Sequence, residues 1–131
     1  MRYMLDTNIC IQAMNHADDT LLTRLIEREG EMCISTVVAA ELRFGVAKSS
    51  AQKKNRQLLA EFLSPLEVLP FDEDAAESYG EVRAALEKSG KPIGPLDTLI
   101  AGHALSLGAT LVTNNVREFQ RVKGLKLESW A

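Results

Sequence analysis

The sequence predicts an α/β fold, with helices around a central parallel sheet of four to five short strands. Short apolar runs alternate with amphipathic stretches along the chain of 131 residues, which is the pattern of successive βαβ units. The apolar runs are uninterrupted, as expected of strands that are buried on both faces. No repeat, linker or low-complexity segment divides the chain, so we expect residues 1–131 to form one domain.

The first strand is predicted at residues 3–5, an apolar run that ends at Asp6. A short helical segment follows, with apolar side chains within residues 9–14. A second helix is predicted to begin at residues 18–20, which supply capping side chains, and to end at Gly30.

Two further strands and two helices are predicted in the middle of the chain. Residues 32–34 form the second strand, and Ser35 or Thr36 then caps a helix. Another helix spans residues 49–64 and ends before a proline, and a third strand follows at residues 66–69. The apolar side chains of the helix at 49–64 are expected to face inward; they are Leu58, Leu59, Phe62 and Leu63.

The remaining elements are two helices and two strands. The acidic residues 72–74 open one helix, where they complement its dipole. Gly94 and Pro95 open the next, because proline suits a first helical turn, and Gly108 ends it. A strand is predicted at residues 110–112 and a weaker one at 125–127. One face of the helix that follows Gly94 is expected to hold Leu96, Leu99, Ile100, His103 and Leu107.

The composition excludes several classes of protein. The net charge of −3 argues against a protein that binds nucleic acid by bulk charge, so any such contact must come from local patches. Cys10 and Cys33 lack the spacing of a zinc site, and we expect both to be reduced and buried. No signal peptide or continuous membrane span is visible, so we expect a cytoplasmic protein without a membrane contact.

Polar residues with possible chemical roles are expected to gather at one edge of the sheet. Asp6 directly follows the first strand, and Asn114 and Asn115 follow the fourth. Asp97 lies in the first turn of a helix, and Glu41 lies within the helix that follows the second strand. Ligands of open α/β sheets bind outside the carboxyl ends of the strands, so these positions form a candidate site.

Such a cluster suits metal-assisted cleavage of a phosphodiester bond. Mg²⁺ takes carboxylate oxygens and keeps several waters, so two or three acids suffice to hold it. The metal activates the attacking water and neutralises the charge that develops on the phosphate. Each acid also has a simpler explanation: Asp6 as a helix cap, Asp97 as a partner of a helix dipole, and Glu41 as an exposed helix edge.

Four separate motifs resemble those of PIN-domain ribonucleases. They are Leu5-Asp6-Thr7-Asn8, Ala40-Glu41-Leu42 with Phe44-Gly45, Pro92-Ile93-Gly94-Pro95-Leu96-Asp97 with Ile100-Ala101, and Thr113-Asn114-Asn115-Val116-Arg117-Glu118-Phe119. Their order, their spacing and the chain length resemble more narrowly the VapC toxins of VapBC toxin–antitoxin modules. The segment from Thr113 to Phe119 and the ending Glu128-Ser129-Trp130 look most like the enteric, plasmid-type members.

The resemblance implies a three-layer α/β/α PIN domain that acts as an endoribonuclease dependent on Mg²⁺ or Mn²⁺. Asp6 and Asp97 would be direct metal ligands, and Glu41 would hold metal-bound water or act as a base. Many PIN domains have an aspartate where Asn115 stands in this chain, so Glu118 is a second candidate for the fourth acidic position.

Three further residues are expected to support this site. Thr7 and Asn8 would orient Asp6 through short hydrogen bonds, although helix capping explains them equally well. Thr113 would place a hydroxyl near the metal, and an ordinary role at a strand end is its alternative.

His103 and Trp130 are expected to be packed into the core rather than to act in chemistry.

Two basic clusters are candidates for contacts with RNA phosphates. The first comprises Lys48, Lys53, Lys54 and Arg56, and the second includes Arg117 and Arg121, which follow the predicted active edge. Solvated surface is the alternative for both clusters.

The resemblance further implies an RNA substrate, with initiator tRNA cut in its anticodon loop, and inhibition of translation. It also implies a VapB-type antitoxin that covers the acidic groove, a toxin homodimer and a higher assembly with the antitoxin.

Two other functions compete with the nuclease. A phosphatase with Asp6 as covalent nucleophile is disfavoured, because Asn8 replaces the second aspartate of such enzymes and no phosphate-binding glycine loop is present. A catalytically inactive module that binds RNA or protein stays open as the alternative to the nuclease. Dependence of activity on a metal separates these hypotheses.

Overall fold

A parallel sheet of five strands runs through the centre of the computed structural model, which describes residues 2–16 and 18–130. The strands lie in the order β3-β2-β1-β4-β5. Their bounds are β1 (Tyr3–Leu5), β2 (Met32–Ser35), β3 (Glu67–Leu69), β4 (Thr110–Val112) and β5 (Lys126–Glu128). Every neighbouring pair is parallel, as the sequence predicts, and the weakly signalled fifth strand is present.

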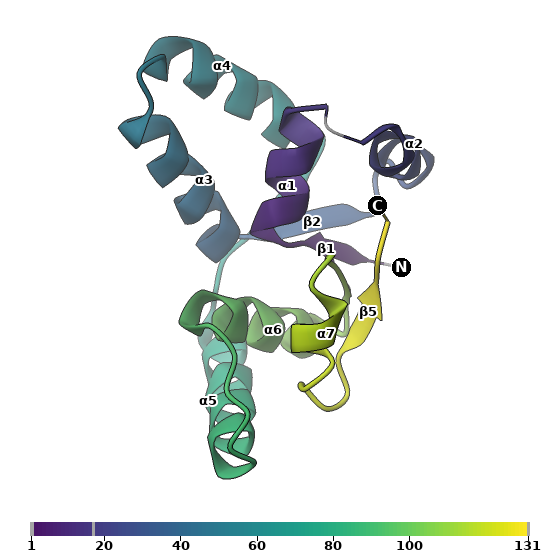
Figure 1. Cartoon of the computed structure of the whole chain (residues 1–131), viewed down its shortest axis with the longest axis vertical. Helices are drawn as coiled ribbons and strands as arrows, with labels where there is room; N and C mark the ends of the chain where they lie inside the picture. Colours follow the sequence, from purple (N-terminus) through teal and green to yellow (C-terminus); the bar gives the residue numbers. More distant parts are fainter. Residues whose placement is uncertain (1, 17, 131) are drawn as a thin grey trace.

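Helices cover both faces of this sheet and give three layers (Figure 1). They are α1 (Thr7–Met14), α2 (Asp19–Glu27), α3 (Thr36–Lys48), α4 (Gln52–Leu63), α5 (Glu73–Lys88), α6 (Pro95–Leu107) and α7 (Val116–Phe119). Helices α1, α3 and α4 lie on one side of the sheet in the view, and α5, α6 and α7 lie on the other. Right-handed crossovers require this arrangement, because the chain reverses its direction across the sheet after β3.

Side-chain caps fix where several helices begin. Asp18 accepts hydrogen bonds from the first turn of α2, and Asp72 accepts one from Ala75 N in α5. Ser35, one of two predicted caps, accepts from Val37 N and begins α3. Gly108 ends α6 in the left-handed conformation, with φ of 64°, as expected of a C-terminal glycine.

The core confirms most of the predicted burial. Cys10 and Cys33 are free and buried, and His103 is buried with its Nδ1 2.8 Å from Ser35 Oγ. Trp130 is also buried, and its ring centroid lies 5.1 Å from that of Tyr3. Both the histidine and the tryptophan therefore pack into the domain.

Two apolar positions differ from the prediction. Leu58 is 44% exposed where it lines an open groove between α1, α3 and α4, whereas Leu59, which lines the same groove, is only 2% exposed. Leu96 is 41% exposed, because it lies in the first turn of α6. Helical spacing places both on an apolar stripe, but the neighbouring elements do not extend far enough to cover them.

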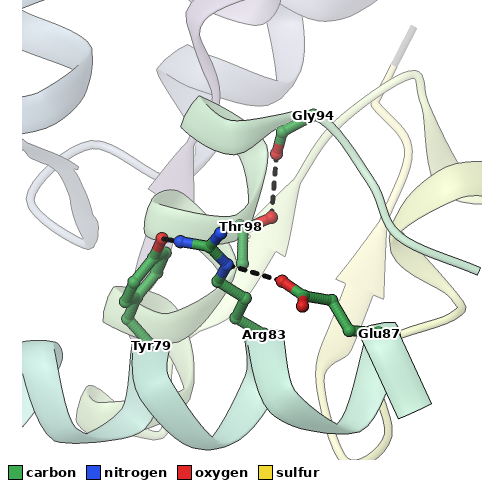
Figure 2. Close-up of polar contacts among 5 residues, drawn as sticks. All are labelled: Tyr79, Arg83, Glu87, Gly94 and Thr98. Atoms are coloured by element: carbon green, nitrogen blue, oxygen red, sulfur yellow. Dashed lines mark hydrogen bonds and ion pairs between the residues drawn. The ribbon is translucent and has the colours of Figure 1, made fainter. Parts of the chain in front are cut away.

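Helices α5 and α6 make the closest contact between helices on their side of the sheet. A Cβ atom added at Gly102 of α6 would lie 2.7 Å from Tyr79 Cα of α5, so only glycine allows this approach. On α5, Arg83 donates hydrogen bonds to the Tyr79 hydroxyl at 3.0 Å and to Glu87 at 2.7 Å (Figure 2). In the same view, the Thr98 hydroxyl donates to Gly94 O and secures the first turn of α6.

Within the described ranges, no helix reaches the length and apolarity needed to cross a bilayer. The longest, α5, has 16 residues and a charged surface.

Candidate active site

The order of strands creates a crevice between β1 and β4. The chain forms β1, β2 and β3 toward one edge of the sheet, and then returns to place β4 and β5 on the other side of β1. Ligands of open α/β sheets bind at such a switch point, outside the carboxyl ends of the strands. Asp6 follows β1 and Thr113 follows β4, and Asp6 N donates to Val112 O at 3.2 Å. Two of the predicted site residues therefore flank this crevice.

Asp6 is held rigidly and is 5% exposed. Its Oδ1 accepts from Ile9 N at 2.9 Å, so it caps α1. The Thr113 hydroxyl donates a second hydrogen bond to the carboxyl group. Burial raises the pKa of Asp6 above its ordinary value, and the hydrogen bonds from Thr113 and Ile9 oppose this effect. The capping role predicted as an alternative thus coexists with a place at the crevice.

Asp97 and Glu118 form a pair of carboxyl groups at the same place. Asp97 lies in the first turn of α6, Glu118 lies on α7, and their side chains are hydrogen-bonded to each other. Burial, the negative charges of Glu118 and Asp6, and this hydrogen bond raise the pKa of Asp97 to about 6. Asp97 is therefore close enough to both other acids for their negative charges to disfavour its ionised form.

Glu118 is the member of the pair with the lowered pKa, so it loses its proton before Asp97 does. Its Oε1 accepts from Gly94 N at 3.0 Å, and its Oε2 accepts from Asn115 Nδ2. The Gly94 hydrogen bond is the largest cause that lowers the pKa of Glu118, with smaller contributions from Asn115 and from nearby Arg121. Environments that drive two neighbouring carboxyl pKa values apart are typical of sites where one acid carries a proton and the other does not.

Gly94 contributes to the site through its backbone N–H, beyond its predicted place at the start of a helix and in the motif that precedes Asp97. A Cβ atom there would lie 3.5 Å from Asp97 Oδ2 and 4.0 Å from Glu118 Oε1. The absence of a side chain therefore keeps the approach to both carboxyl groups open. The glycine before a proline was visible in the sequence, but nothing local indicated that its N–H would meet a glutamate 24 residues away.

Glu41 has a different position from the other acids. It is half-buried on α3 and lines the groove between α1, α3 and α4, together with Ile11 and Leu58. No group of three or more His, Cys, Asp or Glu side chains arranged to hold a metal is found in residues 2–16 and 18–130. Asp97 interacts with both Glu118 and Asp6, and the groove of Glu41 adjoins the cavity of Asp6 at Ile11.

The supporting residues are placed as follows. Thr113 is fully buried, contacts Asp6 directly and accepts from Asn115 N at 2.9 Å. Asn115 joins the cluster through Glu118, not through Asp6. In the described part of the chain, the hydrogen bonds that fix the Asp6 carboxyl come from Ile9 and Thr113, and not from the side chains of Thr7 or Asn8.

The two basic clusters differ in their distance from the acids. Arg117 and Arg121 line a cavity of about 420 Å³ with Lys91, next to α7. Arg121 Nη1 donates to Pro92 O at 3.1 Å, which ties this cavity to the segment that precedes Asp97. Lys53, Lys54 and Arg56 are exposed on α4, and Lys48 Nζ lies 5.1 Å from the centre of the Phe44 ring. Lys91 is a basic residue of this region that the sequence analysis did not select.

The donor set is compatible with a divalent cation. Asp6 and Asp97 offer carboxylate oxygens at one place, where burial and then the charges of Glu118 and Asp6 raise the pKa of Asp97. Mg²⁺ is commonly held by only one or two carboxylates together with waters and substrate phosphates. The residues present therefore fit such an ion.

Comparisons with known proteins agree along the whole chain. The family model described as PIN domain matches residues 3–125. The chain is 44% identical over 131 residues to the tRNA(fMet)-specific endonuclease VapC of Shigella flexneri, covering 100% of this chain and 99% of that protein. It is 46% identical over 132 residues to the Ribonuclease VapC2 of Rickettsia felis, covering 99% of this chain and 98% of that protein.

Solved structures give the same result. A crystal structure of VapBC2 from Rickettsia felis bound to a DNA fragment from their promoter contains a chain with a TM-score of 0.95 and 44% identity, and 100% of both chains is covered. The DNA-bound VapBC from Salmonella typhimurium gives a TM-score of 0.96 and 42% identity, with coverage of 100% of this chain and 99% of that one. With its three-layer architecture and these full-length similarities, this chain belongs to the PIN-domain family and, within it, to the VapC ribonucleases.

Proposed function

We propose that this chain is an endoribonuclease that depends on Mg²⁺ or Mn²⁺ and hydrolyses phosphodiester bonds of RNA as the toxin of a toxin–antitoxin module. The observation that carries the proposal is the convergence of Asp6, Asp97 and Glu118 at the switch point of the sheet. Full-length identity to proteins named as ribonucleases supports it.

Asp6 and Asp97 would hold the metal ion, which when bound would neutralise charge on the scissile phosphate and activate water. Thr113 and Ile9 N fix the Asp6 carboxyl in place. Gly94 N and Asn115 fix Glu118 and keep it ionised, so that it can accept a hydrogen bond from the attacking water. Glu41 is a second candidate for the group that accepts a hydrogen bond from the attacking water, and the substitution of Glu41 described below tests this role.

The proposed substrate is a tRNA. The relative from Shigella flexneri is named a tRNA(fMet)-specific endonuclease, and the similarity to it extends over the whole chain. We therefore propose cleavage of initiator tRNA in its anticodon loop, with loss of translation as the consequence. The cavity of Lys91, Arg117 and Arg121 beside the acids offers positive charge for the backbone of a folded RNA.

The proposed partner is a VapB-type antitoxin, because the similar solved structures are VapBC complexes. An apolar groove of about 290 Å³ between α1, α3 and α4 suits a segment of such a partner, and Leu58, Ile11 and Glu41 contribute to its lining. A segment bound there would cover Glu41 and lie next to Ile11, which also borders the cavity that contains Asp6. We also propose a toxin homodimer that assembles further with the antitoxin.

The experiment is cleavage of total small RNA by the purified protein, with Mg²⁺ or Mn²⁺ added and with EDTA as the control. One discrete cut in one tRNA, lost in EDTA, is expected. No cleavage with either metal, by protein shown to be folded and free of antitoxin, would favour an inactive binding module instead.

Variants assign the roles of the acids. Asp6→Ala and Asp97→Ala are each expected to lower the cleavage rate by at least roughly 10²–10³-fold, the loss typical of removing one preorganised electrostatic contact. Glu118→Gln and Glu41→Gln test the two further candidates separately. Glu77→Ala, an exposed acid on α5, is the matched control and is expected to cleave at the normal rate. An active Asp97→Ala enzyme would contradict the metal site.

A further inference from the structure

A cavity rich in amide side chains lies directly beside Asp6. It has a volume of about 440 Å³ and is lined by Asp6, Asn8, Ile11, Gln12, Asn114 and Asn115. Its walls come from α1 on one side and from the segment between β4 and α7 on the other, so it opens at the switch point of the sheet. Any group bound in it would be the immediate neighbour of a phosphate positioned at Asp6.

Hydrogen bonds hold the amides of this cavity in a defined orientation. Asn114 Nδ2 donates to Gln12 Oε1 at 3.0 Å, across 102 positions of the sequence. Ser129 Oγ donates to Asn114 Oδ1 at 3.4 Å, and Asn115 Nδ2 donates to Glu118. The Gln12 Nε2 group donates to no protein acceptor in the part of the chain that the structure describes. Its two N–H groups are therefore available to a ligand.

The chemistry of this lining favours a nucleobase over a phosphate. A primary amide presents a donor and an acceptor in one plane, which matches the edge of a base, and Asn and Gln are residues that read base edges in this way. Ile11 is 41% exposed and supplies an apolar surface for the face of the ring. The only charged residue in the lining is Asp6, which repels an anion, so a phosphate suits the separate cavity of Lys91, Arg117 and Arg121 better.

We propose that this cavity binds the base of the nucleotide next to the cleaved bond, and that Gln12 and Asn114 determine which base is preferred there. The inference rests on the proposed ribonuclease function, which it makes more specific. The amide side chains of this cavity would then bind a base of the RNA, and the cavity of Lys91, Arg117 and Arg121 would bind its phosphate backbone.

The test uses the purified full chain and a pool of RNA hairpins in which the positions around the mapped cut are randomised. Cleaved ends are sequenced for the wild type, Gln12→Met and Asn114→Ala. Gln12→Met keeps the length of the side chain and removes its hydrogen bonds, and Asn114 is exposed, so neither change disturbs the core. Gln57→Met, an exposed glutamine on α4, is the matched control.

In both variants, the ratio of cleavage between the preferred base and the other bases is expected to fall roughly tenfold at one position beside the cut. The preferences at the other positions are expected to stay unchanged. Gln57→Met is expected to keep the wild-type profile. Variants that cleave more slowly but with an unchanged profile would overturn the inference and leave the ribonuclease function standing. A wild-type protein that cleaves no RNA with either metal would overturn the proposed function itself, and this inference with it.

Discussion

At the scale of single residues, the candidate site is governed by an imbalance of charge. Burial and the charges of Glu118 and Asp6 raise the pKa of Asp97, whereas the N–H of Gly94 and the amide of Asn115 stabilise the charge of Glu118. Of the two carboxyl groups, Asp97 therefore keeps its proton to the higher pH, up to about pH 6. A bound cation would stabilise the ionised carboxylate of Asp97 and so favour loss of its proton.

This imbalance predicts how Asp97→Asn changes stability without metal. The pKa of Asp97 is about 6 in the folded protein against an ordinary value of 3.8, so the unfolded chain loses its proton first as the pH rises. The Asp97 carboxyl therefore lowers the stability of the wild type between about pH 4 and pH 6, and the variant lacks this contribution. We expect the variant to melt a few degrees above the wild type at pH 7.5 in EDTA, with little difference at pH 4.

Thermal unfolding at a series of pH values checks this expectation. His103, whose pKa is lowered by burial, destabilises both proteins alike on acidification, so the difference between their melting temperatures isolates Asp97. Addition of Mg²⁺ is expected to raise the melting temperature of the wild type more than that of the variant. Equal melting temperatures at every pH would show that Asp97 is not crowded by the other acids.

At the scale of elements, the site depends on how closely α5 and α6 approach each other. Gly102 allows α6 to lie against the backbone of Tyr79, and α6 carries Asp97 in its first turn. The contact is tight because the added Cβ atom would meet backbone atoms, which cannot rotate away as a side chain can. Helix packing thus fixes the position of the N-terminus of α6.

Gly102→Ala is therefore expected to destabilise the protein by about 1–3 kcal/mol, because the two helices must separate. Gly80→Ala on α5 is the matched control: nothing lies within 4 Å of its added Cβ, and alanine there is expected to stabilise the helix by about 0.5–1 kcal/mol. Urea denaturation of both variants gives the free energies of unfolding. A neutral Gly102→Ala would mean that α5 and α6 are free to separate without cost.

At the scale of the whole molecule, the two ends of the chain meet beside the central strand. Trp130 is 2% exposed, packs its ring against Tyr3 of β1, and donates from Nε1 to Glu128 Oε1 at 2.9 Å. The N-terminal strand β1 leads directly into Asp6. The C-terminal segment therefore supports the strand that carries a candidate metal ligand.

Trp130→Ala is expected to lower the free energy of unfolding by about 3–5 kcal/mol, because it leaves a large cavity against Tyr3. Trp130→Phe keeps an aromatic ring and loses the hydrogen bond to Glu128, so a loss of about 1 kcal/mol is expected. Calorimetry of the two variants gives this comparison. Similar melting temperatures for the wild type and Trp130→Ala would contradict a supporting role for the C-terminal segment.

Local sequence patterns determined which elements form. Uninterrupted apolar runs predicted the strands within a residue or two, and the caps at Asp18, Ser35 and Asp72 placed the starts of helices. These signals are local, because they depend on side chains that bond to backbone within one turn. The four-residue helix α7 went unpredicted, since one turn is too short to show a helical period. The exposure of Leu58 and Leu96 was also missed, because periodicity identifies a stripe but not what covers it.

Which residues meet was decided by the tertiary structure. The sequence predicted Asp6, Asp97, Glu118 and Glu41 as candidates; in the fold, Asp97 interacts with Glu118 and Asp6, and Glu41 lines a groove that shares Ile11 with the cavity of Asp6. The hydrogen bonds from Gly94 N to Glu118 and from Asn114 to Gln12 likewise join segments far apart in the sequence. No local pattern encodes such contacts, because the reversal of strand order between β1 and β4 creates them, and that order results from the packing of all the layers together.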